Sequence, residues 1–126
     1  MKGASLIALA ALLAPAPLLA MPSLHCGSPQ RGAPSLYVSV GSGGGVDHLR
    51  IIEGRRHVDI TAMPRANPRI VHGFMDDSGR LSVRILRDGN VLVASLELPG
   101  GRRARPGLFR YRGQAWRISC RWDQTD

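Results

Sequence analysis

The segment Leu81–Leu98, LSVRILRDGNVLVASLEL, decides the fold class of this protein. In its first half an apolar set alternates with a polar pair, which is the pattern of a strand with one buried face. The apolar set is Leu81, Val83 and Ile85, and the polar pair is Ser82 and Arg84. Asp88-Gly89 in the middle supplies the positive φ that tight hairpins require. In the second half we expect one buried face made of Leu92, Ala94, Leu96 and Leu98.

The same alternation continues on both sides of this hairpin. Turn residues recur every eight to twelve positions, as in all-β domains. Pro64 and Pro68 bracket a loop, because proline has no N–H to donate to a strand ladder. The expected flanking strands carry Leu36, Val38 and Val40, then run over Val46–Glu53, then carry Val58, Ile60 and Ala62 inward, and then run over Arg69–Met75, Gly107–Arg112 and residues 114–122. The sequence therefore predicts a small antiparallel up-and-down barrel of about eight strands, with a two-sheet β-sandwich as the alternative.

The last two expected strands form the sharpest pattern in the chain. Phe109 and Tyr111 share one face of the first, with arginines on the other. In the second, an aromatic and sulfur face made of Trp116, Ile118, Cys120 and Trp122 alternates with Arg117, Ser119 and Arg121. We expect the aromatic face to point inward.

The first 20 residues are typical of an export signal. Met1-Lys2 is a short positive start, residues 4–14 are almost entirely apolar, and Pro15 and Pro17 precede a cleavage site after Ala20. The apolar run is shorter than the roughly 20 residues that a membrane anchor needs. We therefore expect a signal peptide at 1–20, a leader with Cys26 at 21–34, one β domain at 35–122, a tail at 123–126, and a periplasmic or secreted location.

Cys26 and Cys120 are the only cysteines, one near each end of the expected domain. In an oxidising compartment a pair without a third cysteine is expected to form one intramolecular disulfide. The two residues lack the C-x-x-C spacing of redox-active pairs, so the predicted bond is structural.

The charge balance is strongly basic. The chain has a formal net charge of +8, and without Lys2 sixteen arginines against nine acidic residues leave +7. Guanidinium groups bind phosphate and carboxylate bidentately, which suits lipid phosphates or cell-wall carboxylates. A composition also rich in Ala, Gly and Pro offers a plainer explanation, namely a GC-rich coding sequence.

The candidate anion-binding residues lie in the loop Pro99–Pro106 and on the outward side of the last hairpin. They are Arg102, Arg103, Arg105, Arg110, Arg112, Arg117 and Arg121. If the loop folds over the hairpin, the seven side chains would converge and hold a polyanion. The alternative is an ordinary solvated surface. No nucleic-acid recognition motif is present, and only Tyr37 is expected to point outward as a stacking platform.

Other candidate sites have weaker support. His48, His57, His72 and Asp59 would approach one another if adjacent strands are in register, but they lack the spacing of zinc ligands, so no metal site is predicted. His25 lies in the expected leader. Gly41–Gly45 lacks the lysine and the following helix of a phosphate loop and is expected to be a flexible hairpin loop.

Catalytic constellations are not supported either. Asp47 and His48 are consecutive in a strand and should point to opposite faces, and Asp76-Asp77 is explained by a turn. No Gly-x-Ser-x-Gly elbow occurs. A hydrolase or metal enzyme built around His48 and His57 is therefore the weakest of the hypotheses.

In outline the chain resembles the small exported β-barrel inhibitors of lysozyme, which share the signal, the size, a disulfide and a final aromatic strand. The resemblance implies the architecture only, because a positive charge of +7 would repel a basic enzyme. We expect an exported, non-enzymatic cell-envelope binding or structural module without a cofactor. Binding of a polyanion or anionic lipid through the arginine-rich hairpin is the alternative.

Overall fold

The computed structural model of the protein describes residues 23–101 and 105–123. These residues form nine β-strands and contain no helix. The strands are β1 (Ser23–Gly27), β2 (Ser35–Val40), β3 (Val46–Glu53), β4 (Arg56–Thr61), β5 (Arg69–Met75), β6 (Leu81–Arg87), β7 (Val91–Leu98), β8 (Gly107–Tyr111) and β9 (Gln114–Asp123).

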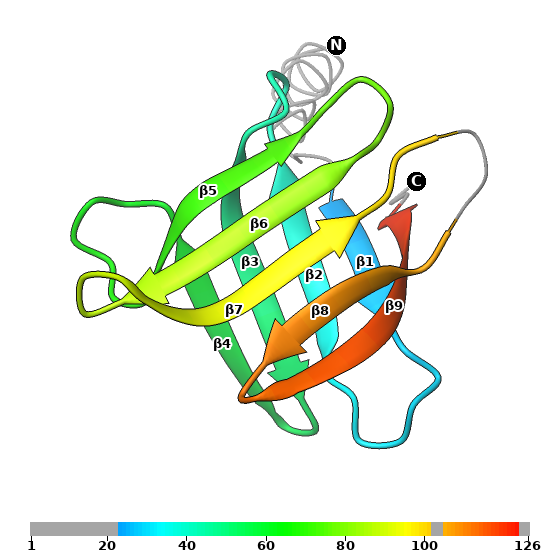
Figure 1. Ribbon diagram of the computed structural model, residues 1–126, viewed down its shortest axis with the longest axis horizontal. Coiled ribbons are helices and arrows are strands. Elements are labelled where there is room, and N and C mark those ends of the chain that lie inside the picture. The colour runs from blue at the N-terminus through cyan, green and yellow to red at the C-terminus, as the bar shows by residue number, and fades with distance from the viewer. Residues whose placement is uncertain (1–22, 102–104, 124–126) are drawn as a thin grey trace, which may run out of the picture.

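All strand pairs are antiparallel, in the order β4-β3-β2-β1-β9-β8-β7-β6-β5. The sheet curls round so that β4 and β5, its two ends, approach each other (Figure 1). The predicted all-β architecture is confirmed as a nearly closed barrel, with nine strands where about eight were expected. The predicted signal peptide lies in residues 1–20, outside the described part of the chain.

The additional strand is β1, which lies within the segment 21–34 that was expected to be a leader and for which no strand was predicted. Ser23–Gly27 pairs with β2 on one side and with β9 on the other. Cys26 lies directly opposite Cys120, with their Cα atoms 4.0 Å apart, and the two residues form the predicted disulfide. The bond therefore joins the first strand to the last, across 94 positions of sequence.

The interior is filled by side chains of alternating positions from all nine strands, as expected for a barrel of this size. No polar or charged side chain is buried in the described part of the chain. Phe109 is the largest fully buried residue, and the rings of Tyr111 and Trp116 stack against it at 5.7 and 6.1 Å between centroids. The core residues are Leu24, Cys26, Leu36, Val38, Val40, Val46, Leu49, Ile51, Ile60, Ile70, Leu81, Val83, Ile85, Ala94, Leu96, Leu98, Phe109 and Ile118.

Four residues expected to face the interior are exposed instead. Leu92 is opposite Leu86 on the outer face, because a β-bulge at Val93 shifts the alternation of β7. Val58 is opposite Ile51 on the inner face, but β4 is at one end of the sheet and Val58 is covered only in part. Ala62 lies past the end of β4, and Trp122, opposite Leu24, lies near the end of β9.

At one end of the barrel β5 crosses over β3 and closes the gap between them. Gly44 and Gly73 permit this close approach, because an added Cβ at either position would clash. Met75 N donates to Gly44 O at 2.8 Å, and Gly45 forms a single β-bridge with Phe74. Gly73 lies against Val46, where an added Cβ would be 2.8 Å from Val46 Cβ. Gly41–Gly45 forms the hairpin loop that was expected, and this loop also docks on β5.

The loop between β4 and β5 is tied to the hairpin between β6 and β7. Asn67 Nδ2 donates to Asp88 Oδ1 at 2.8 Å, and Asp88 N donates to Asn67 Oδ1 at 3.0 Å. The hairpin itself has positive φ at Asp88 and Gly89, as its Asp-Gly sequence predicted. These contacts fix the loop that spans the open side of the barrel.

The disulfide is expected to be a major stabilising element. A Cys26→Ala/Cys120→Ala variant should lose about 4 kcal/mol of the free energy of unfolding, because the bond closes a very long loop in the unfolded chain. Urea unfolding followed by tryptophan fluorescence measures this loss, and reduced wild-type protein should match the variant. Equal midpoints for oxidised wild type and variant would show that strand pairing alone joins the ends.

The crossing of β5 over β3 is expected to be intolerant of a side chain at Gly73. Gly73→Ala should destabilise the protein by about 1–3 kcal/mol through overpacking against Val46. Gly27→Ala is the matched control, because an added Cβ there meets nothing within 4 Å. Thermal denaturation of both variants tests the difference, and similar melting temperatures would contradict the steric account.

Candidate anion-binding face

Three arginines lie on the outer surface of neighbouring strands. Arg84 on β6 is opposite Ser95 on β7, and Ser95 is opposite Arg110 on β8. Since neighbouring strands are about 4.8 Å apart, the backbones of Arg84 and Arg110 are roughly 10 Å apart. Arg117 on β9 is opposite Leu108 and is a diagonal neighbour of Arg110. We call this surface, with Arg84, Arg110 and Arg117, the arginine face.

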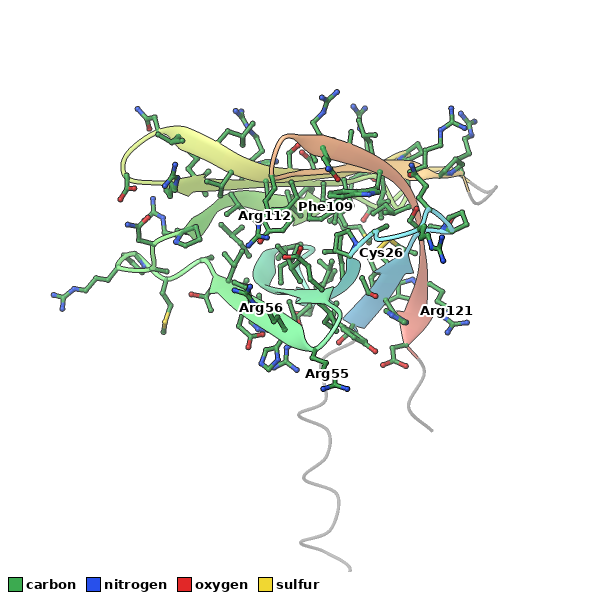
Figure 2. All side chains as sticks on the ribbon, turned by 90° about the horizontal axis from the view of Figure 1, so that it is seen from below. Cys26, Arg55, Arg56, Phe109, Arg112 and Arg121 are labelled. Carbon is green, nitrogen blue, oxygen red and sulfur yellow. A yellow bond between two sulfur atoms is a disulfide. The ribbon has the colours of Figure 1, made fainter. Side chains whose placement is uncertain are left out.

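The three side chains are exposed and carry no ion pair within the described residues. Glu97 is the carboxylate that shares their surface, and it accepts a hydrogen bond from Ser82 Oγ at 2.7 Å. In Figure 2, nitrogen-tipped side chains project outward from the upper layer of the molecule, on the side of β6 to β8. The arginine face therefore presents positive charge to the solvent.

The structure separates the seven arginines that the sequence grouped. Arg110 and Arg117 belong to the arginine face. Arg112 is in the turn between β8 and β9, where it has a positive φ, lies over the Tyr111 ring at 5.3 Å and approaches Glu53 Oε2 to 3.6 Å. Figure 2 shows it between the two layers of the barrel.

The other members of that group lie elsewhere or outside the described residues. Arg121 is opposite His25 on the outer side of β1 and β9, lower in Figure 2 than the upper layer. Arg105 precedes β8 and lines a cleft at the end of the barrel together with Trp122. Arg102 and Arg103 fall outside the described part of the chain.

Arg84 was missed as a site residue, although its outward orientation was expected. Its alternation with Val83 and Ile85 predicted that its side chain points outward. In the sheet, β6 is separated from β8 by β7 alone. His72, opposite Arg84 on β5, extends the same row. The expected up-and-down order already implied this neighbourhood of β6 and β8; what sequence reasoning lacked was the register that puts Ser95 opposite both Arg84 and Arg110.

A second polar cluster lies on the outer side of β3 and β4. Asp59 accepts hydrogen bonds from Arg50 Nε at 2.8 Å and Arg50 Nη2 at 3.2 Å. His48 Nε2 donates to Asp59 Oδ1 at 2.9 Å, because an ionised carboxylate can only accept, and His57 Nε2 is 3.9 Å from Oδ2. The hydrogen bond from Arg50 lowers the pKa of the Asp59 carboxyl below its ordinary value; burial opposes this shift, and His48 adds to it.

This cluster is the neighbourhood that the sequence suggested for His48, His57 and Asp59, but it does not resemble a metal centre. Within the described residues no group of three His, Cys, Asp or Glu side chains has the geometry to hold a metal ion. The guanidinium of Arg50 instead donates to both oxygens of the Asp59 carboxylate. His72 is on the other side of the barrel, and His25 stacks on Tyr37 with 4.5 Å between ring centroids.

The structure places the two carboxylate patterns considered for catalysis as follows. The partner of His48 is Asp59, on the neighbouring strand, and not Asp47. Asp76 closes its turn by accepting from Ser78 Oγ at 2.6 Å, Ser78 N at 2.9 Å and Arg80 N at 3.0 Å. The expected turn at Asp76-Asp77 is therefore confirmed.

Comparison with protein-family models, with curated proteins and with solved structures gives no match. Among the residues that the structure describes, none forms a helix of the length and apolarity needed to cross a bilayer. The candidate site therefore rests on the geometry and chemistry of this chain alone.

The Asp59 cluster is expected to make stability depend on pH in the acid range. Because the folded-state pKa of Asp59 is depressed, its contribution is present above the ordinary carboxyl pKa of about 4 and disappears as pH falls through the folded value. Asp59→Asn should cost about 0.5 kcal/mol at pH 7, as for exposed ion pairs, and less at pH 2. Urea unfolding at several pH values measures this.

Asp77→Asn is the matched control, since Asp77 is exposed and makes no ion pair with another described residue. Its stability should follow that of the wild type over the whole range. An Asp59→Asn variant with the same pH profile as the wild type would show that the cluster contributes nothing to folding.

Proposed function

We propose that the protein is an exported, non-enzymatic cell-envelope domain that binds phosphate- or carboxylate-bearing surfaces through the arginine face. The observation that carries this proposal is the placement of Arg84, Arg110 and Arg117 on one outer surface, exposed and without carboxylate partners in the described part of the chain. Planar guanidinium groups bind oxyanions bidentately, and their charge is retained at every physiological pH.

The spacing of the three side chains supports a repeating or extended ligand. Arg84 and Arg110 are separated by one strand and Arg117 lies diagonally from Arg110, so the charges are spread over a surface. Ser95, between Arg84 and Arg110, adds a hydroxyl that can donate to the same oxyanion. A single small anion would require converging groups, whereas this arrangement suits several anionic groups displayed side by side.

The compartment is consistent with the proposal. A disulfide between the first and last strands is typical of proteins in oxidising compartments. The predicted export signal at 1–20 would deliver the domain to the periplasm or the outside of the cell, where lipid phosphates and cell-wall carboxylates are abundant anions. The predicted +7 of the exported chain favours association with such surfaces at long range.

The proposal predicts that specific arginines, and not net charge alone, set the affinity. Arg84→Gln/Arg110→Gln/Arg117→Gln should elute from phosphocellulose at a much lower salt concentration than wild type. The slope of log affinity against log salt should become shallower by about one for each arginine–phosphate interaction that the substitutions remove. Salt-gradient elution and binding titrations at several salt concentrations measure both quantities.

The matched control is Arg55→Gln/Arg56→Gln/Arg65→Gln, which removes the same charge from exposed positions outside the arginine face (Figure 2). It should elute close to wild type. Equal reductions of affinity in the two triple variants would reduce the effect to net charge and refute the assignment of the face.

A further inference from the structure

Exposed apolar side chains share the outer surface with the arginines. The bulge at Val93 turns Leu92 outward, opposite Leu86, and Leu86 is two residues from Arg84 on the same face of β6. Leu92 is 48% exposed and its neighbour Val91 is 47% exposed. Leu92 therefore stands in water next to the arginine row, whereas Val91, opposite Arg87, points to the other face of β7 at the tip of the hairpin.

Leu92 and Arg110 line the same depression. It has a volume of about 210 Å³ and lies where β7 diverges from the β8–β9 hairpin, with Ser95 and Gln114 also in its wall. An apolar side chain, a guanidinium and an amide thus border one hollow. The mixture fits a ligand that carries an anionic group beside hydrocarbon.

A second exposed apolar residue lies at the opposite side of this surface. Phe74 on β5 is opposite Ser82 on β6, in the row that continues through Glu97 and Leu108 to Arg117, and it is 47% exposed. The arginines therefore lie between apolar side chains on one continuous outer surface.

We infer that the arginine face binds the surface of a bilayer containing anionic phospholipid, an inference that rests on the proposed function. The three arginines contact headgroup phosphates, and Leu92 and Phe74 enter the boundary between headgroups and acyl chains. Electrostatic attraction and shallow apolar insertion are each weak, and stable binding to membranes generally combines two such signals. A soluble polyanion contacts the charges alone and leaves Leu92 and Phe74 in water.

The experiment compares two probes, vesicles of neutral phosphatidylcholine with 30 mol% phosphatidylglycerol and phosphocellulose beads. Phe74→Ser/Leu92→Ser should lower vesicle affinity about tenfold and leave elution from phosphocellulose unchanged. Val58→Ser/Met63→Ser removes two exposed apolar side chains from outside the arginine face and should bind vesicles as the wild type does. Vesicles of phosphatidylcholine alone should bind weakly.

A fluorescence readout tests insertion directly. Leu92→Trp should shift its emission to shorter wavelengths on vesicles and be quenched by lipid brominated high on the acyl chain. Met63→Trp, the control in the β4–β5 loop, should show neither change. An unshifted, unquenched Trp at position 92 would overturn the inference.

The outcomes separate the two proposals. Retention on phosphocellulose without vesicle binding, or wild-type vesicle affinity in Phe74→Ser/Leu92→Ser, refutes the lipid inference and leaves the arginine face as a site for a polymeric anion. An arginine triple variant that is retained on phosphocellulose like wild type refutes the proposed function, and the lipid inference fails with it.

Discussion

The pairing of β1 with β9 is the interaction on which the rest of the structure depends. These two strands come from opposite ends of the described chain, and their contact converts two runs of hairpins into one curled sheet. Every other strand pair in the sheet joins neighbours in sequence and closes only a short loop, whereas this pair must close a long one. The disulfide between Cys26 and Cys120 lies within it and holds the register that puts Arg121 opposite His25.

Local alternation made most of the fold predictable. Val46–Glu53 and Arg69–Met75 matched β3 and β5, because inward and outward side chains alternate there and turns punctuate the chain. Ser23–Gly27 was missed because it offers only Leu24 and Cys26 as an apolar pair and follows the predicted signal closely. The docking of Gly44 and Gly73 between β3 and β5 is a long-range contact that no local pattern encodes.

The candidate site was predictable in orientation but not in assembly. Alternation placed Arg110 and Arg117 outward, and both are. Arg112 is a turn residue with positive φ, and its side chain contacts Glu53 from a different hairpin. Arg84 joined the face through the register of β6, β7 and β8, and Leu92 reached the surface through a bulge that inserts one residue into a regular pattern. A site on a sheet can therefore be predicted only when the pairing and register of the strands are known. The inward or outward orientation of a side chain follows from the two-residue alternation alone.

The order of the strands in the curled sheet has a consequence for protein engineering. Ser23 and Asp123 are paired residues, so a short linker between them would convert the first and last strands into an ordinary hairpin. New termini opened between residues 62 and 68 would interrupt no strand, because the loop there spans the seam between β4 and β5. Such a circular permutant would keep all eight strand pairs, and its ends would no longer need a covalent sulfur bond to find each other.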